Sequence, residues 1–150
     1  MRYADILLMH AEAKIELNQL DAGMLSAINL VRARAGQPAA TIGSQAQMRQ
    51  LVRRERTVEF GGEGLRLADL RRWDIVLPAM NTVVVGAATN PLDPPATPTF
   101  DINDIPTYTA AKRISVRAQT RTNTARHKLW PIPQGEIDKN PNIVQNPGWQ

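Results

Sequence analysis

Opposite charges alternate along residues 53–74, and two carboxylates in this stretch stand one helical turn apart. Glu55 and Glu59 at that spacing could in principle serve as the acid and the base of a hydrolytic reaction. Arginines flank both residues, however, and neighbouring cations lower the pKa of a carboxyl group and keep it ionised. A general acid needs its pKa raised instead. We therefore predict that the protein is not an enzyme. The expected role is a structural ion-pair network, whose members are Arg32, Arg34, Glu55 and Glu59.

The spacing of the remaining reactive residues does not predict a metal or phosphate site. The chain has no cysteine, and its two histidines, His10 and His127, stand far apart. Gly61, Gly62 and Gly64 lack both the preceding strand and the following Lys-Ser/Thr of a phosphate-binding loop, so they are interpreted as the end of a helix. We predict no metal ion and no cofactor.

Apolar residues at helical spacing predict the elements that hold these charges. Residues 3–17 and 22–35 each carry one apolar stripe, and the short turn between them predicts two antiparallel helices. Asp21 is a suitable N-cap for the second helix. Gly36 is a natural residue to follow its end. The first half of the chain is therefore predicted to begin with a helical hairpin.

A second hairpin is predicted after it. Ser44 and Gln47 form a capping box that opens a third helix, which ends at Gly61. A fourth helix is expected over residues 63–73, with an extension to about Leu77 where Pro78 limits it. The predicted fold class is therefore mainly α.

Regular spacing is lost in the second half of the chain. Five prolines fall within residues 86–109, which predicts a long Pro-rich excursion. Residues 111–127 are predicted to be mostly coil, with a short strand near residues 114–116.

Two closely spaced prolines stiffen the segment near the C-terminus. Pro131 and Pro133 each fix φ near about −65° and push the preceding residue into extended geometry. We predict that residues 129–150 form an extended strap docked on the rest of the chain, and that its removal lowers thermal stability. Trp130 and Trp149 flank the strap and are the predicted anchors.

The length of 150 residues predicts a single domain, and the net charge of +4 has a local origin. Six cations and no acid fall between residues 105 and 135: Lys112, Arg113, Arg117, Arg121, Arg126 and Lys128. A nucleic-acid site would need aromatic residues interleaved with these cations. None lies between Tyr108 and Trp130, so no nucleic-acid partner is predicted.

Three segments resemble the SusD/RagB family of nutrient-binding proteins. Residues 129–149, LWPIPQGEIDKNPNIVQNPGW, resemble its C-terminal signature. RYADILLMHAEAKIELNQ and INLVRARAG, within residues 2–36, resemble its first conserved helices. RRERTVEFGGEGLRLADLRRW, within residues 49–74, resembles its Arg/Glu-rich helix pair. The motifs follow the order of the family and together cover about half of the chain.

The resemblance implies a function and a location. Members of this family are surface lipoproteins of Bacteroidetes-type bacteria that capture glycans for a SusC-like TonB-dependent outer-membrane transporter. We therefore expect non-catalytic binding of oligosaccharides or polysaccharides at the outer membrane. The membrane contact would be a lipid anchor absent from this chain, since the chain is expected to be a fragment of a longer protein.

The resemblance also implies an architecture. The helices are expected to form tetratricopeptide-like hairpins over residues 1–79, followed by a variable loop region over residues 80–128 and the docked strap over residues 129–150. The alternative is a helical-repeat scaffold for protein–protein contact that binds no sugar.

A glycan-binding role directs attention to the seven aromatic residues, because a flat ring can stack on the apolar face of a pyranose. Tyr3, Phe60 and Trp73 are expected to pack inward. Phe100 and Tyr108, in the Pro-rich excursion, remain as the candidate sugar platforms.

Overall fold

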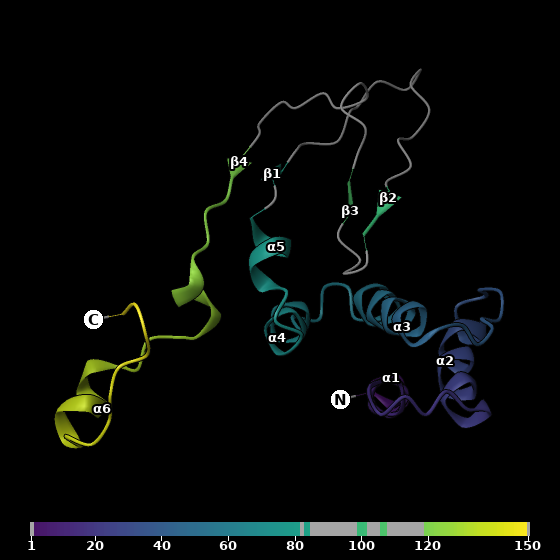
Figure 1. Ribbon diagram of the computed structural model, residues 1–150, viewed down its shortest axis with the longest axis horizontal. Coiled ribbons are helices and arrows are strands. Elements are labelled where there is room, and N and C mark those ends of the chain that lie inside the picture. Colours follow the sequence, from purple (N-terminus) through teal and green to yellow (C-terminus); the bar gives the residue numbers. More distant parts are fainter. Residues whose placement is uncertain (1, 82, 85–98, 102–105, 108–118, 150) are drawn as a thin grey trace. The chain divides into compact units, whose positions relative to one another are not determined.

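The computed structural model describes residues 2–81, 83–84, 99–101, 106–107 and 119–149. Helices make up most of this part of the chain (Figure 1), so the predicted mainly α class is confirmed. The chain divides into two compact units. The first unit holds Met1–Arg66 and Pro98–Thr107, and the second holds Leu67–Thr97 and Tyr108–Gln150. The tetratricopeptide-like arrangement and the three-part division of the chain stay predictions.

Two helices joined by a tight turn open the first unit. They are α1 (Tyr3–Glu16) and α2 (Ala22–Arg34), and each ends within one residue of its predicted limit. Asn18 in the turn has a φ of 56°, a left-handed conformation that asparagine tolerates better than most residues. The Asp21 carboxylate accepts a hydrogen bond of 2.9 Å from the amide of Met24, so the predicted N-cap is confirmed.

The third helix, α3 (Gln45–Glu59), begins with the predicted capping box. Ser44 Oγ accepts a hydrogen bond from the Gln47 amide, and Gln47 Oε1 accepts one of 2.8 Å from the Ser44 amide. The loop before α3 is closed by Asn29, whose side chain accepts a bond from the Ala40 amide at 2.8 Å and donates to the Ala40 carbonyl at 3.2 Å. The backbone of this loop is thereby held against α2.

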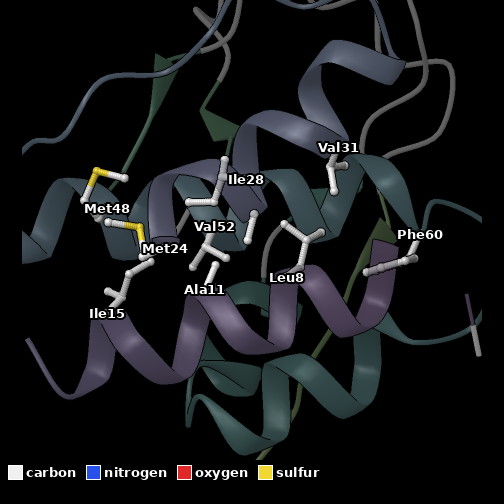
Figure 2. Close-up of a cluster of buried hydrophobic side chains, with 10 residues drawn as sticks. Leu8, Ala11, Ile15, Met24, Ile28, Val31, Met48, Val52 and Phe60 are labelled. Atoms are coloured by element: carbon white, nitrogen blue, oxygen red, sulfur yellow. The ribbon is translucent and has the colours of Figure 1, made fainter. Parts of the chain in front are cut away.

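The core of the first unit lies where α1 packs against both α2 and α3. Figure 2 shows its side chains reaching toward one another from the three helices. The buried members of the cluster are Leu8, Ala11, Ile15, Met24, Ala27, Ile28, Val31, Met48, Val52 and Phe60. Full burial of a Leu, Ile or Val side chain stabilises the fold by about 1.5–3 kcal/mol, so this cluster is the main source of stability of the unit.

The three aromatic residues expected to pack inward differ in their burial. Phe60 is buried in the core, as predicted. Trp73 is half-buried and packs against the smaller core of the second unit. Tyr3 is 72% exposed, so its prediction is wrong. The apolar stripe of α1 runs through Leu8, Ala11 and Ile15, and Tyr3 lies off this stripe in the first turn.

The predicted fourth helix begins three residues later than expected. The structure has α4 (Arg66–Arg72) where the sequence predicts a helix over residues 63–73. Gly62 and Gly64 precede α4 with φ values of 83° and 78°. Because a left-handed residue interrupts the right-handed helical path, the helix cannot begin before Gly64 has been passed.

A separate helix, α5 (Val76–Met80), follows α4 after a break at Asp74, where φ is 55°. Pro78 lies inside α5, so the prediction that it limits a helix here is wrong. Proline is tolerated in the first turn because the amide it lacks would have no partner within the helix. The buried residues of these two helices and their junction form a second core cluster, made of Leu70, Ile75 and Val76.

Two antiparallel strand pairs complete the described elements of the two units. In the first unit β2 (Thr99–Phe100) pairs with β3 (Pro106–Thr107), and in the second β1 (Val83–Val84) pairs with β4 (Gln119–Thr120). The short strand predicted near residues 114–116 lies outside the described residues.

The C-terminal strap is only partly extended. A 3₁₀ turn, η2 (Ala125–Lys128), precedes it, and α6 (Gln134–Lys139) lies within it. The prediction of extended structure is therefore wrong for these six residues. Pro133 fixes its own φ and restrains the residue before it, but it leaves the following residues free to turn into a helix.

Within the described residues, no helix combines the length and the apolar character that crossing a lipid bilayer requires.

Candidate functional site

Among the described residues of the first unit, Arg56 is the most deeply buried charged residue, at 5% exposed. Its Nη1 lies 3.0 Å from Asp5 Oδ1, and its Nε lies 4.0 Å from Glu12 Oε2. The guanidinium group also lies over the Phe60 ring, 5.1 Å from the centroid. Both carboxylates come from α1, so Arg56 links α3 to α1 through charge as well as through apolar packing. Sequence reasoning did not identify this cluster.

Glu59, at the end of α3, forms ion pairs with two arginines. Arg2 Nη1 lies 2.6 Å from Glu59 Oε1, and Arg34 Nη2 lies 2.5 Å from Oε2. Arg2 also pairs with Glu63 at 2.5 Å. Burial raises the pKa of the Glu59 carboxyl, but the hydrogen bonds from Arg2 and Arg34 outweigh that effect and hold the pKa below its ordinary value. Glu59 is therefore held as an anion.

Glu55 pairs with Arg32, whose Nε also donates a hydrogen bond of 2.8 Å to the Pro38 carbonyl. The side chains of Arg32 and Glu55 are 18% and 12% exposed. Glu55 and Glu59 thus each face α2 arginines, as the predicted network requires. That these pairs act as structural ties between helices, and not as a reactive site, stays a prediction.

Of the two candidate sugar platforms, the structure places Phe100. This residue belongs to β2 and is 45% exposed. The guanidinium group of Arg54 lies over its ring, 4.6 Å from the centroid. A cation therefore lies over the ring of this exposed residue, and its role as a sugar platform stays a prediction. Tyr108 lies outside the described residues.

The second unit contains a groove of about 820 Å³ that the sequence did not reveal. It is lined by Arg71, Arg72, Asp74, Ala125, Arg126, Lys128, Leu129, Trp130, Pro147 and Gly148. These residues come from α4 and the turn after it, from η2 and the chain just beyond it, and from the turn at the end of the strap. The groove is called the strap groove below.

Two arginines that line the strap groove each lie over a tryptophan ring. The Arg71 guanidinium lies 4.5 Å from the centroid of the Trp130 ring, and the Arg126 guanidinium lies 5.0 Å from that of Trp149. Arg71 Nη2 also donates a hydrogen bond of 3.3 Å to the His127 carbonyl. α4 and η2 are thus joined directly at the groove.

The end of the strap is held by Trp149. Its Nε1 donates to the carbonyls of Arg126 at 2.9 Å and Leu129 at 3.2 Å. The Trp149 ring meets the His127 ring edge to face, with centroids 5.8 Å apart. Gly148, with φ of 81°, lies so close that a Cβ there would be 2.8 Å from Arg126 Cβ. Only glycine fits this position without displacing Arg126.

The two predicted anchors make different kinds of contact. The side chain of Trp130 is exposed, and the residue is 67% accessible. Its backbone carbonyl accepts a hydrogen bond of 2.7 Å from Asn146 Nδ2. The neighbouring Gln145 side chain accepts a hydrogen bond of 2.8 Å from the Ile132 amide and donates one of 2.9 Å to the Ile132 carbonyl. The Trp149 side chain therefore has the contacts expected of an anchor, whereas the strap holds Trp130 mainly by its backbone. Their roles as anchors stay predictions.

We expect Trp149→Ala to lower the free energy of unfolding of the second unit by about 2 kcal/mol, because two hydrogen bonds and two ring contacts are lost. Trp130→Ala should cost less than about 1 kcal/mol, because it removes one exposed cation–π contact. All three tryptophans lie in the second unit, so thermal unfolding followed by the fluorescence of the two that remain measures the effect. Equal losses in the two variants would contradict this assignment.

Among the described residues, no group of three or more His, Asp or Glu side chains is placed to hold a metal ion.

Comparison with known proteins places the chain in a family. The sequence model of the SusD family matches residues 1–149. No curated protein sequence matches the chain. Several solved structures do, and the chain spans only about a quarter of the length of those described next.

A SusD-like protein from Bacteroides fragilis aligns with a TM-score of 0.71 and 29% identity, over 99% of this chain and 25% of that protein. A SusD-like carbohydrate-binding protein from the same species aligns with a TM-score of 0.70 and 30% identity, over 96% of this chain and 28% of that protein. A SusD homolog from Bacteroides thetaiotaomicron has a TM-score of 0.62 and 28% identity, over 99% and 26%. Because the family match extends over nearly the whole sequence, the chain belongs to the SusD family.

Proposed function

We propose that this chain is part of a cell-surface protein that binds glycans without modifying them and delivers them to a SusC-like TonB-dependent transporter. The observation that carries the proposal is the match to the SusD family over residues 1–149, together with 30% identity to a SusD-like carbohydrate-binding protein. The proposed location is the outer membrane, with attachment through a lipid anchor.

The electrostatics of α3 support binding rather than catalysis. Acid-catalysed cleavage of a glycosidic bond needs a carboxyl group that keeps its proton, which requires a raised pKa. Glu59 has its pKa lowered, and Glu55 is paired with an arginine. The energy for transport would come from the partner transporter, so no reactive group is needed in this chain.

Phe100 and Tyr108 remain the proposed sugar platforms. An exposed aromatic ring offers a flat surface of negative potential, which the polarised C–H groups of a pyranose can meet. Phe100 has the required exposure, and the Arg54 guanidinium over its ring restrains the orientation of that ring.

Affinity gel electrophoresis tests this proposal. The chain is basic, with a pI of about 10.0, so it would be run toward the cathode through gels that contain one polysaccharide each. We expect at least one polysaccharide to retard the protein, and Phe100→Ala to remove most of that retardation. Tyr3→Ala is the matched control, because it removes an exposed aromatic ring from α1 and should leave migration unchanged.

Two results would contradict parts of the proposal. Retardation that persists unchanged in Phe100→Ala would exclude this ring as a platform while leaving glycan binding intact. Normal migration in every gel would contradict glycan binding by this chain and would favour a scaffold for protein–protein contact.

A further inference from the structure

Cations in the part of the chain that the structure describes mostly have carboxylate partners. Such pairs involve Arg2, Lys14, Arg32, Arg34, Arg49, Arg56, Arg72, Lys128 and Lys139. Arg71 and Arg126 differ from these. Among the described residues no carboxylate lies within 4.0 Å of either one, and each guanidinium instead lies over a tryptophan ring. Both residues line the strap groove.

The charges lining the strap groove are unbalanced. Its lining contains four cationic residues and one acid, Asp74. That acid is already engaged, because Lys128 Nζ lies 2.5 Å from Asp74 Oδ1. Arg72 Nε pairs with Asp69 at 2.8 Å, outside the lining. The positive charge of Arg71 and Arg126 therefore remains uncompensated within the groove, which gives the groove a preference for an anion.

The position over a tryptophan ring leaves Arg126 able to bind a ligand, because Arg126 is exposed, whereas Arg71 already donates Nη2 to the His127 carbonyl and has a buried Nε. A guanidinium that lies on an aromatic ring uses its flat face for that contact. Its N–H groups point outward in its own plane, where they can grip a carboxylate or a sulfate with two parallel hydrogen bonds. The tryptophan beneath also limits the rotamers of the arginine, which lowers the entropy lost when a ligand is bound.

An aromatic surface stands beside this charge. Trp130 lines the groove and is 67% exposed, with Arg71 covering one face of its ring. The uncovered face is available to a planar or ring-shaped ligand. A ligand that combines a ring with an anionic group fits this combination of side chains better than a simple anion or a neutral sugar does.

We propose that the strap groove binds anionic sugars, with the pyranose ring on the uncovered face of Trp130 and its carboxylate or sulfate group on Arg126, while Arg71 supports the opposite face of the Trp130 ring and adds positive charge to the groove. The sugar class rests on the glycan-binding function proposed above, whereas the anion preference rests on the groove itself. The residues that line the strap groove all belong to the second unit, whereas Phe100 belongs to the first. Acidic polysaccharides are therefore expected ligands of this chain.

Isothermal titration calorimetry of the 150-residue chain tests the site. The probes are polygalacturonate, its fully methyl-esterified form, a sulfated galactan and a single-stranded oligothymidylate. Methyl esterification keeps the sugar backbone but removes the negative charge. We expect the chain to bind polygalacturonate at least about tenfold more tightly than the ester, since a charge-assisted bidentate contact is lost. The sulfated galactan separates sulfate from carboxylate as the recognised group.

Variants locate the binding. Arg126→Gln keeps the part of the side chain that packs on Gly148, and it should weaken polygalacturonate binding about tenfold. Trp130→Ala should weaken it by a similar factor. Arg121→Gln is the matched control, because it removes one charge from the same basic segment but lies outside the groove lining, and it should bind like the unmodified chain. All variants should still unfold cooperatively, with melting temperatures within a few degrees of that chain, because each removes at most one exposed contact.

Each other outcome overturns the site. Equal binding of polygalacturonate and its ester, unaffected by Arg126→Gln, would reject the anion preference while leaving glycan binding intact. Equal loss in Arg121→Gln and Arg126→Gln would show an effect of net charge alone. Equally tight binding of oligothymidylate would indicate a nucleic-acid site. Absence of binding to any polysaccharide would reject both this site and the proposed function.

Discussion

Replacement of Arg56 by methionine is expected to lower the free energy of unfolding by about 3–5 kcal/mol. Methionine fills a similar volume, so the change removes the charge and leaves most of the packing. Asp5 and Glu12 then keep their negative charges in a site where they are 14% and 10% exposed, without the cation that lies between them and Phe60. An uncompensated buried charge costs far more than the intact pair contributes.

Urea unfolding at pH 7, followed by circular dichroism at 222 nm, measures this loss. The signal suits the first unit, because α1, α2 and α3 hold most of the described helical residues. Arg49→Met is the control. Arg49 also links α3 to α1, through Glu16, but these side chains are 32% and 45% exposed. An exposed pair contributes less than about 1 kcal/mol. Losses of equal size in the two variants would show that burial does not determine the role of Arg56.

Replacement of Ile28 by alanine is the second change with a large expected effect, a loss of about 2–5 kcal/mol. Ile28 is fully buried and lies in the α1–α2–α3 core (Figure 2). Removing three carbon atoms there forfeits their transfer free energy and leaves a cavity that the packed neighbours fill only in part.

The control for Ile28 is Leu30→Ala on the same helix. Leu30 is 53% exposed, and its truncation should change the free energy of unfolding by less than about 1 kcal/mol. The same urea titration compares the two variants. If Leu30→Ala were the more destabilising change, the face of α2 that packs inward would have been assigned wrongly.

The helices of the first unit could be predicted because their signals are local. Apolar spacing, the Asp21 cap and the capping box at Ser44 each act within a few residues, and all three agree with the observed limits of α1, α2 and α3. The fourth helix was less well predicted. Gly64 and Asp74 have positive φ values. These two residues determine where α4 begins and where it is separated from α5, and their backbone conformation depends on the surrounding tertiary packing.

The burial of Arg56 could have been predicted from the spacing of apolar residues in α3. Met48, Val52, Arg56 and Phe60 follow one another at intervals of four along α3 and its end. This spacing places Arg56 on the apolar face, where a charge must find a partner. Which acids would meet it could not be read from the sequence, because Asp5 and Glu12 come from another helix, about fifty residues away in the chain.

The strap groove illustrates the same limit. Arg71, Arg126 and Trp130 belong to three separate segments of the sequence, and each looked ordinary in its own context: one in a charged helix, one in a basic stretch, one beside two prolines. Their approach depends on the contact of Arg71 with the His127 carbonyl and on the bonds that Trp149 makes to Arg126 and Leu129. No local pattern encodes such long-range contacts.

The mainly helical class, the limits of the first three helices and the resemblance to the SusD family could all be predicted from the amino-acid sequence. These follow from periodicity, capping and long motifs, which depend on neighbours along the chain. The three-dimensional fold was needed to show which charges are buried, which aromatic rings stay exposed and which cations lack an acid partner among the described residues. Those properties depend on segments that meet through the fold, and they determine where a ligand can bind.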